Sequence, residues 1–467
     1  MLKNSTYNIK KANNFAIAKL FVDSQKNVWY YVNKKNIVLR CEMSVSYKRL
    51  WKLLIDRDMK KKELAKIAGI SNFTISKMSA GNNVTVEVLG KICKALNCTL
   101  DDIMEFIPDN DIRVDRSMAN RDYEIFSGEV LVAIWKGSNL VIVNDKLLPL
   151  YLKRVHNADF WLETRAIDSH RANSRLLKKA LRLVEKDDVS TVIHVNGATI
   201  TDNYWIREIG SNLSYNDIKF SNDYFSNLAL KGNYDSFNRV ANSKHSKTPE
   251  LTNVGSFEKC WKLRDGKWWM YKKATHDEMF SELFVYELGK ALGMNMAVYE
   301  RGDGFIKSLD FTDGATINFE PASTFMGDNE DYFDVVKILE DICPNAVKDY
   351  VRMIFMDTIC ANPDRHTNNF GLLRNTTTGE LIGFAPNYDN NMALISRGYP
   401  SKTKSNDMLI SIFNELMDAY PSYRAYIPKV TQSMINDVID KINMRVKSQV
   451  IVDFVISRYK LVNNEEF

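Results

Sequence analysis

Several features that mark particular classes of protein are missing from this chain of 467 residues. It contains no stretch of about eighteen apolar residues, so the sequence predicts no membrane-spanning helix. It has no apolar core of signal length followed by small residues, which argues against a secretory signal. The six cysteines form no Cys-x-x-Cys pair and lie among apolar neighbours. We therefore expect reduced thiols in the cytoplasm and no disulfide or thiolate metal site.

A strong charge of one sign and internal repeats are also missing. The net charge of +5 and the pI of about 8.6 make the chain only mildly basic, which excludes neither an acidic nor a neutral partner. Hydrophobic residues make up 45% of the chain and aromatic residues 11%, enough for several cores. At this length the sequence predicts a multidomain protein without a membrane partner.

The most informative segment that is present is the polar run 362–369, NPDRHTNN, which follows an apolar helix. It places Asp364 five residues before Asn369, the spacing of a phosphotransferase catalytic loop. In such a loop the aspartate orients or accepts the proton of the attacking hydroxyl, and the asparagine holds a magnesium ion. A second metal ligand should follow, and Asp389, after the predicted hairpin 370–384, is the candidate.

Other parts of a kinase site occur upstream in the same order. A predicted hairpin with its turn at Asp265-Gly266 puts Lys272 and Lys273 on opposite faces of the second strand, so one of them enters the cleft. The segment 277–292 has helical periodicity and carries two glutamates one turn apart, Glu278 and Glu282. A strand lysine paired with a helix glutamate would hold the lysine on nucleotide phosphates.

A second informative region, residues 61–78, has the spacing of a helix-turn-helix. Ala65 allows two helices to cross, Gly69 suits a turn with positive φ, and Ile75 lies beneath the second helix. With Ile75 and Met78 facing the core, the second helix would present an outward set to a DNA major groove. That set consists of Ser71, Asn72, Phe73, Ser76 and Lys77.

Lys61 and Lys62 enter the first motif helix where backbone phosphates of DNA would lie. Flanking helices are predicted at 47–55, 84–96 and 100–107. The block from Met43 onward resembles a small Cro/CI-type bacterial repressor, an all-α five-helix domain. The alternative is a helical interaction module that does not contact DNA.

Residues from about 123 to 460 resemble a HipA-type serine/threonine kinase, the toxin kinase of bacterial toxin–antitoxin pairs. The resemblance rests on the 362–371 run and on the segment 386–389, PNYD. It implies ATP and Mg²⁺ as cofactors, Asp364 as the base, and Asn369 and Asp389 as metal ligands. It also selects Lys272 over Lys273 and Glu282 over Glu278.

The resemblance further implies roles for the loop neighbours and for a phosphate loop. Arg365 and His366 are expected to order the catalytic loop, although His366 could contact a phosphate. The phosphate loop falls at 248–256, which contains one glycine, Gly255. Thr252, Gly255 and Ser256 are the expected nucleotide contacts, and Ser256, with Thr252 as its rival, is the candidate for autophosphorylation.

The expected organisation is an α+β protein with a two-lobed kinase behind a helical DNA-binding domain. Residues 1–42 carry eight Lys or Arg against two acids and are either translated non-coding sequence or a basic arm. Strands are expected at 15–22 and 28–32 and, in a later subdomain, around 129–143. The predicted divisions are 1–42, a helix-turn-helix domain 43–107, a linker 108–122, an amino-terminal kinase subdomain 123–245, a nucleotide lobe 246–330 and a catalytic lobe 331–467.

The sequence thus predicts an ATP-dependent protein kinase fused to a repressor that binds operator DNA as a homodimer. Two alternatives remain open: a small-molecule phosphotransferase, and a transcription regulator that senses nucleotide without catalysis. The segment 201–205, TDNYW, is distinctive, and a helix cap followed by core aromatics is its expected role. The protein substrate and the operator sequence are not readable from the chain.

Overall fold

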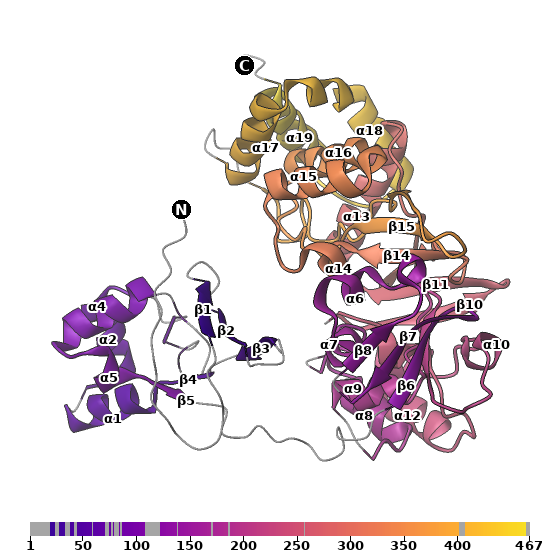
Figure 1. Cartoon of the computed structure of the whole chain (residues 1–467). Helices are drawn as coiled ribbons and strands as arrows, with labels where there is room; N and C mark the ends of the chain where they lie inside the picture. Colours follow the sequence, from indigo (N-terminus) through magenta and orange to yellow (C-terminus); the bar gives the residue numbers. More distant parts are fainter. Residues whose placement is uncertain are drawn as a thin grey trace, which may run out of the picture. The chain divides into compact units, whose positions relative to one another are not determined.

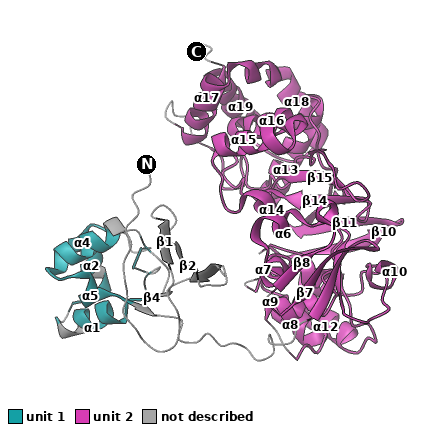
Figure 2. Cartoon of the chain, in the orientation of Figure 1, with its two compact units in different colours: residues 1–119 teal, residues 120–467 magenta. Residues whose placement is uncertain are grey.

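The structure is a computed structural model in which the chain forms two compact units, residues 1–119 and 120–467 (Figure 2). The described residues are 19–23, 28–32, 38–41, 44–57, 59–70, 74–75, 78, 84, 86–107, 122–137, 139–169, 171–184, 187–255, 257–400 and 407–463.

Of the predicted second motif helix, the structure describes only Thr74, Ile75 and Met78. The other predicted helices of the helix-turn-helix domain are present in the first unit. They are α1 (Lys48–Asp56), α2 (Lys61–Ala68), α4 (Val86–Leu96) and α5 (Leu100–Ile103). Gly69 ends α2 with φ of 63°, and its N–H donates to the carbonyls of Ala65 and Lys66, as the turn required. Ile75 and Met78 are buried in the core formed by these helices, which agrees with the predicted inward face of the second motif helix.

The last predicted helix of this domain is shorter than expected. It ends at Ile103, and the segment expected to continue it forms β5 (Glu105–Ile107), antiparallel to β4 (Ser44–Ser46). The side chain of Arg49 in α1 supports this pairing, because its Nε lies 3.2 Å from Glu105 Oε2. Ahead of the domain, β1 (Lys19–Asp23), β2 (Val28–Val32) and β3 (Val38–Cys41) form an antiparallel sheet where two strands were expected.

The second unit begins with a four-stranded sheet in the order β8-β7-β6-β9. Its strands are β6 (Asp122–Ser127), β7 (Val130–Lys136), β8 (Asn139–Ile142) and β9 (Tyr204–Glu208). Asp122, expected in the linker, starts β6, and linker residues 108–121 lie outside the described residues. The short helices of this part of the chain are η2 (Asp145–Leu147), α6 (Leu150–Val155), α7 (Ala158–Glu163), α8 (Ser174–Ala180), α9 (Asp188–Ile193), α10 (Tyr215–Ile218), α11 (Ser226–Lys231) and α12 (Tyr234–Ala241).

A second sheet, ordered β10-β11-β13-β12, carries the predicted lysine hairpin. Its turn is Asp265-Gly266, and both residues have positive φ (50° and 75°), the conformation that a two-residue hairpin turn needs. The elements here are η3 (Pro249–Thr252), β10 (Lys259–Arg264), β11 (Lys267–Lys273), α13 (His276–Ala291), β12 (Tyr299–Arg301) and β13 (Phe305–Leu309).

The remaining residues form a largely helical lobe with a three-stranded sheet, β14-β15-β16. In Figure 1, α15–α19 gather at one end of the unit, with β14 and β15 between them and the amino-terminal sheet. The elements are β14 (Ile317–Pro321), α14 (Ala322–Met326), α15 (Tyr332–Ile342), η4 (Pro344–Ala346), α16 (Val347–Ile359), β15 (Gly371–Asn375), β16 (Leu381–Phe384), α17 (Met408–Ala419), η5 (Pro421–Tyr426), α18 (Gln432–Ile442) and α19 (Ser448–Val462).

The sequence predicted reduced cysteines and no membrane-spanning helix. Cys93, Cys98, Cys260, Cys343 and Cys360 are free thiols, as expected. Within the described parts of the chain, no helix has both the length and the apolar character needed to cross a membrane.

Two glycines in the helix-turn-helix unit allow a matched test of its fold. Gly69→Ala should destabilise the unit by about 1 kcal/mol, because an L side chain is strained at positive φ. Gly90→Ala should stabilise it by up to about 1 kcal/mol, because Gly90 is exposed within α4 with open space around it.

Hydrogen exchange of the full chain, read by mass spectrometry on peptides from α2 and α4, measures both effects. The expected result is faster exchange in Gly69→Ala and slower exchange in Gly90→Ala. Equal exchange in the two variants would show that the turn at Gly69 is not formed in solution.

Candidate functional site

The predicted catalytic loop joins the carboxyl end of α16 to β15. Asp364 is half-buried, and its backbone N–H donates to the side-chain oxygen of Asn362 at 3.3 Å. Asn362 in turn donates to Asp357 Oδ1 at 2.9 Å from its side chain, and its backbone N–H bonds the Asp357 carbonyl at 2.8 Å. The conformation of the loop around Asp364 is therefore set by contacts with the last turns of α16.

A buried ion pair between Arg365 and Asp357 anchors this loop. The guanidinium donates through Nε and a terminal nitrogen to both carboxylate oxygens, each at 2.8 Å. Burial alone would lower the pKa of Arg365, but the Asp357 carboxylate outweighs it and raises that pKa. Sequence reasoning missed Asp357, although it is the only charged residue in the buried stretch 353–359 of α16.

The same guanidinium also reaches the segment that contains Asp389. It donates to the carbonyl oxygens of Asn369 at 2.8 Å and Tyr388 at 2.7 Å. It donates further to the side-chain oxygens of Asn387 at 3.1 Å and Asn390 at 2.6 Å. Arg365 thus has the ordering position that was predicted for it, and it holds the loop and the Asp389 segment together.

Asn369 and His366 are both turned back onto the loop. The side-chain nitrogen of Asn369 donates to the Asp364 carbonyl at 3.0 Å, and the residue is buried. His366 Nδ1 accepts the backbone N–H of Asn368 at 3.2 Å, so this nitrogen carries no proton in the bonded form. This contact shapes the loop, in line with the ordering role expected for His366.

Lys272 of β11 enters the site and meets Asp389. Its Nζ donates to Asp389 Oδ1 and, at 3.1 Å, to Asn391 Oδ1. Burial alone would lower the pKa of Lys272, but the carboxylates of Asp389 and Glu282 outweigh it, so the pKa is raised. Lys273 points to the other face, is exposed and lies 3.3 Å from Glu258, so Lys272 is the lysine of the two that reaches Asp389.

Asp389 has a left-handed backbone conformation, with φ of 59°. Its N–H donates to the Tyr299 hydroxyl at 2.9 Å. Burial raises the pKa of Asp389, but the nearby cations Lys272, Lys259 and Arg365 outweigh it, and the pKa falls below its usual value. The carboxylate is therefore kept charged, the form in which it can bind a metal ion.

Glu282 of α13 is buried close to Asp389. The expected direct bond from Lys272 to Glu282 is not formed. Its Oε1 accepts the backbone N–H of Asn390 at 2.8 Å and the side-chain N–H of Asn390 at 3.1 Å. Burial, followed by the charge of Asp389, raises the pKa of Glu282 to about 7. The lysine pairs with the nearer carboxylate, Asp389, and Asn390 connects the helix glutamate to Arg365.

The rejected alternative, Glu278, has a different role. Its carboxylate accepts the Thr275 N–H at 2.7 Å, and the Thr275 hydroxyl accepts the Glu278 N–H at 3.3 Å. This reciprocal pair caps the start of α13.

The predicted phosphate loop lies beside the two strands of the lysine hairpin. Gly255 has φ of 110°, and a Cβ atom there would lie only 2.5 Å from Lys259 Nζ. Lys259 stands directly opposite Lys272 in the hairpin register, and burial followed by the charge of Lys272 lowers its pKa to about 8. Sequence reasoning missed Lys259, although the two-residue turn at Asp265-Gly266 sets that register.

The other two predicted phosphate-loop residues are Thr252 and Ser256. Thr252 is buried at the end of η3, and its hydroxyl donates to the Ala198 carbonyl at 2.7 Å. That contact directs the hydroxyl toward the amino-terminal subdomain. Ser256 lies outside the described residues.

The groups gathered here suit a magnesium–nucleotide complex. Carboxylate and amide oxygens are the donors that Mg²⁺ prefers, and Asp389 and Asn369 supply one of each. Lys272 and Lys259 are half-buried cations with which phosphate oxygens can pair. The fit rests on the charge and burial of these side chains.

Most of the predicted DNA-binding residues lie outside the part of the chain that the structure describes. Ser71, Asn72, Phe73, Ser76 and Lys77 lie outside the described residues, as does the side chain of Lys62. Lys61 begins α2 and is exposed, with its Nζ 4.0 Å from the centre of the Trp51 ring.

Comparison with protein families finds two matches. Residues 49–109 match the Cro/C1-type helix-turn-helix DNA-binding domain, and residues 251–449 match the HipA-like C-terminal domain. No curated protein matched the chain.

Solved structures include three similar proteins. The transcriptional regulator VanUg is 49% identical over 16% of this chain and 96% of its own, with a TM-score of 0.15. The proinflammatory kinase CtkA of Helicobacter pylori is 17% identical over 44% of this chain and 92% of its own, with a TM-score of 0.35.

The third is a chain from the Shewanella oneidensis MR-1 complex of HipA, HipB and operator DNA. It is 12% identical over 73% of this chain and 99% of its own, with a TM-score of 0.43. The two family matches carry the assignment: the chain contains a Cro/C1-type helix-turn-helix domain at residues 49–109 and a HipA-like C-terminal domain at residues 251–449.

Proposed function

We propose that the chain is an ATP- and Mg²⁺-dependent serine/threonine protein kinase whose helix-turn-helix domain represses its own operon. The observation that carries the kinase part is the convergence of the Asp364 loop, Lys272 and Asp389 around Arg365. These residues come from separate elements, yet they meet in one partly buried network of hydrogen bonds. A nucleotide sensor without catalysis would not need a carboxylate placed as Asp364 is placed.

In this proposal each residue has one task. Asp364 takes the proton of the substrate hydroxyl as that hydroxyl attacks the terminal phosphate of ATP. Asp389 and Asn369 hold magnesium, which neutralises charge on the nucleotide phosphates when it is bound. Lys272 and Lys259 pair with phosphate oxygens, while Glu282 and Arg365 keep the Asp389 segment in place through Asn390.

The catalytic proposal predicts different defects for two aspartates. Asp364→Asn should keep the fold and the affinity for Mg-ATP but lower phosphate transfer by at least about 100-fold, because it removes the base and keeps the shape. Asp389→Ala should also weaken magnesium-dependent ATP binding, since it removes a metal ligand and the partner of Lys272.

Transfer from labelled ATP, with and without cell lysate, together with calorimetric titration of Mg-ATP, measures both defects. Glu278→Gln is the matched control, because Glu278 only caps α13 and should leave transfer unchanged. Wild-type transfer by Asp364→Asn would rule out the catalytic assignment. Transfer to a small molecule alone would favour the alternative phosphotransferase.

We further propose that the phosphate loop is a site of autophosphorylation, with Ser256 as acceptor and Thr252 as its rival. A phosphate on either residue would place a dianion where ATP phosphates bind, and would lower ATP affinity. Thr252 is buried and its hydroxyl donates to the Ala198 carbonyl, so phosphorylation of Thr252 would have to break that bond. Mass spectrometry after incubation with Mg-ATP should find phosphate between residues 248 and 256, and its absence there would reject the idea.

The repressor part predicts binding of a homodimer to a short inverted repeat upstream of the gene, because one motif of this size reads few base pairs. Lys77→Ala should weaken binding for all sequences and reduce the salt slope by about 1 if this lysine meets a phosphate. Asn72→Ala should relax preference at one base position, at a cost of roughly 1–3 kcal/mol, if this side chain reads a base edge.

Mobility shifts and salt titrations of the full chain on upstream DNA test this prediction. Lys136→Ala removes the same charge from an exposed position in the other unit and should bind as the wild type does. No shift at any salt concentration would favour the alternative, a helical module that docks onto protein.

A further inference from the structure

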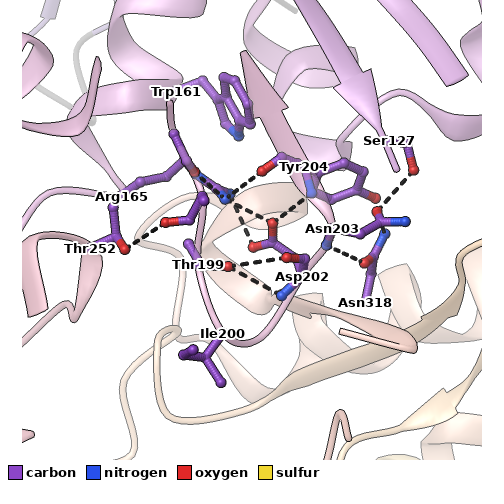
Figure 3. A network of polar contacts seen from close by, with 12 residues as sticks. Ser127, Trp161, Arg165, Thr199, Ile200, Asp202, Asn203, Tyr204, Thr252 and Asn318 are labelled. Carbon is purple, nitrogen blue, oxygen red and sulfur yellow. Dashed lines mark hydrogen bonds and ion pairs between the residues drawn. The ribbon is translucent and has the colours of Figure 1, made fainter. Parts of the chain in front are cut away.

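The segment 198–203 of the amino-terminal subdomain, here the Ala198–Asn203 turn, touches several kinase elements (Figure 3). The sequence predicted a helix cap here, followed by core aromatics. The aromatics Tyr204 and Trp205 are buried as expected, but they begin strand β9, so the residues before them do not cap a helix. The polar residues ahead of them therefore have a different role.

An ion pair fixes the turn from within its own subdomain. Arg165 donates to both oxygens of Asp202, at 3.1 and 2.7 Å, and both side chains are almost fully buried. Arg165 also donates to the Gly197 carbonyl at 3.1 and 2.9 Å, and its guanidinium lies 4.8 Å from the Trp161 ring centre. Asp202 accepts the Tyr204 N–H at 3.0 Å, so its carboxylate ties the two ends of the turn together.

On one side the turn bonds the element that leads into the phosphate loop. The Ala198 carbonyl accepts the Thr252 hydroxyl at 2.7 Å, and Thr252 ends η3 three residues before Gly255. Next to this contact, Ile200 packs in one apolar cluster with Trp261 and Trp268 of the lysine hairpin. The turn therefore supports both the base of the phosphate loop and the strands that carry Lys259 and Lys272.

On its other side the turn bonds β14. The Thr201 carbonyl accepts the Phe319 N–H at 2.9 Å. Asn203 and Asn318 form a reciprocal pair, in which the Asn203 N–H reaches Asn318 Oδ1 at 2.8 Å and the Asn318 amide reaches Asn203 Oδ1 at 2.9 Å.

Phe319 extends this second contact to the metal-binding candidate. Its ring lies 5.8 Å from the ring of Tyr388, edge to face, and Tyr388 directly precedes Asp389. The carbonyl of Tyr388 is also one of the acceptors of Arg365. A shift of β14 would therefore move Tyr388 through its contact with Phe319, and with it the neighbouring residue Asp389.

We propose that the Ala198–Asn203 turn is a positioning element of the kinase site, and that Asp202 is its positioning residue. The turn keeps the phosphate loop and the Asp389 segment at the spacing that Mg-ATP requires. This inference rests on the proposed kinase function. Asp202 itself has its carboxylate bonded within the subdomain, so it acts through the turn and not on the nucleotide.

The test compares Mg-ATP affinity with stability in the full chain, by calorimetric titration and thermal unfolding. Asp202→Asn removes the charge that holds Arg165 and should weaken Mg-ATP binding on the order of tenfold. Thr252→Val removes the hydroxyl bond to Ala198, together with the longer contact to the Pro249 carbonyl within η3, and should weaken binding several-fold. Thr252→Ser keeps the hydroxyl and should restore binding.

The double variant separates a shared effect from two independent ones. If Asp202 and Thr252 act through the same turn, the combined loss should be clearly smaller than the product of the single losses. Glu124→Gln is the matched control, because Glu124 lies on β6 of the same subdomain and pairs at 2.7 Å with Arg207 of β9, outside the Ala198–Asn203 turn. It should lower the unfolding temperature and leave affinity unchanged.

Unchanged affinity in both Asp202→Asn and Thr252→Val would overturn the inference, as would an equal loss of affinity in Glu124→Gln. If Asp202→Asn does not fold, Thr252→Val with its serine rescue decides alone. A wild-type chain that binds no Mg-ATP would instead reject the proposed function. If the wild-type chain binds Mg-ATP but transfers no phosphate, catalysis is rejected. The affinities of the variants then still decide the role of the turn.

Discussion

The site depends on one buried ion pair, Arg365 with Asp357. A guanidinium has five N–H donors in a fixed plane, and here they connect the end of α16, the catalytic loop and the segment around Asp389. Removing one partner of such a pair leaves a buried charge at a cost of about 3–5 kcal/mol. The position of Asp364 relative to Asp389 therefore follows from an arginine that has no need to touch a substrate.

Charge balance explains why the remaining ionisable groups can be buried together. Lys272 and Lys259 are adjacent cations on paired strands, and Asp389 and Glu282 are the nearby carboxylates. The charges of Asp389 and Lys272 offset each other's burial, which keeps Asp389 ionised and Lys272 protonated. Glu282 and Lys259 each lie beside a like charge that adds to the effect of burial, so the pKa of Glu282 rises to about 7 and that of Lys259 falls to about 8. Fusion to the helix-turn-helix unit adds a different effect, since a covalent link raises the local concentration of one unit near the other without any new contact.

The order of motifs along the chain was sufficient to predict the two kinds of domain. Local rules explain this success: the two-residue turn at Asp265-Gly266 sets a hairpin, and Gly69 ends a helix at positive φ. The same rules fail where a partner distant in sequence decides. The segment 105–107 is a strand and not a helix because β4 lies beside it. Asp202 does not cap a helix, because its carboxylate pairs with Arg165, which lies two residues after the end of α7.

By itself, the sequence determined which residues are available for chemistry: Asp364, Asn369, Asp389 and Lys272, with their spacing and types. Only the tertiary structure decided how they are paired. In the folded chain Lys272 bonds Asp389 and Glu282 bonds Asn390. Lys259 and Asp357 also lie at the site, and the 198–203 turn contacts it on two sides. The physical reason is that spacing along the chain is local, whereas a buried charge is satisfied by whichever partner the fold brings within hydrogen-bonding distance.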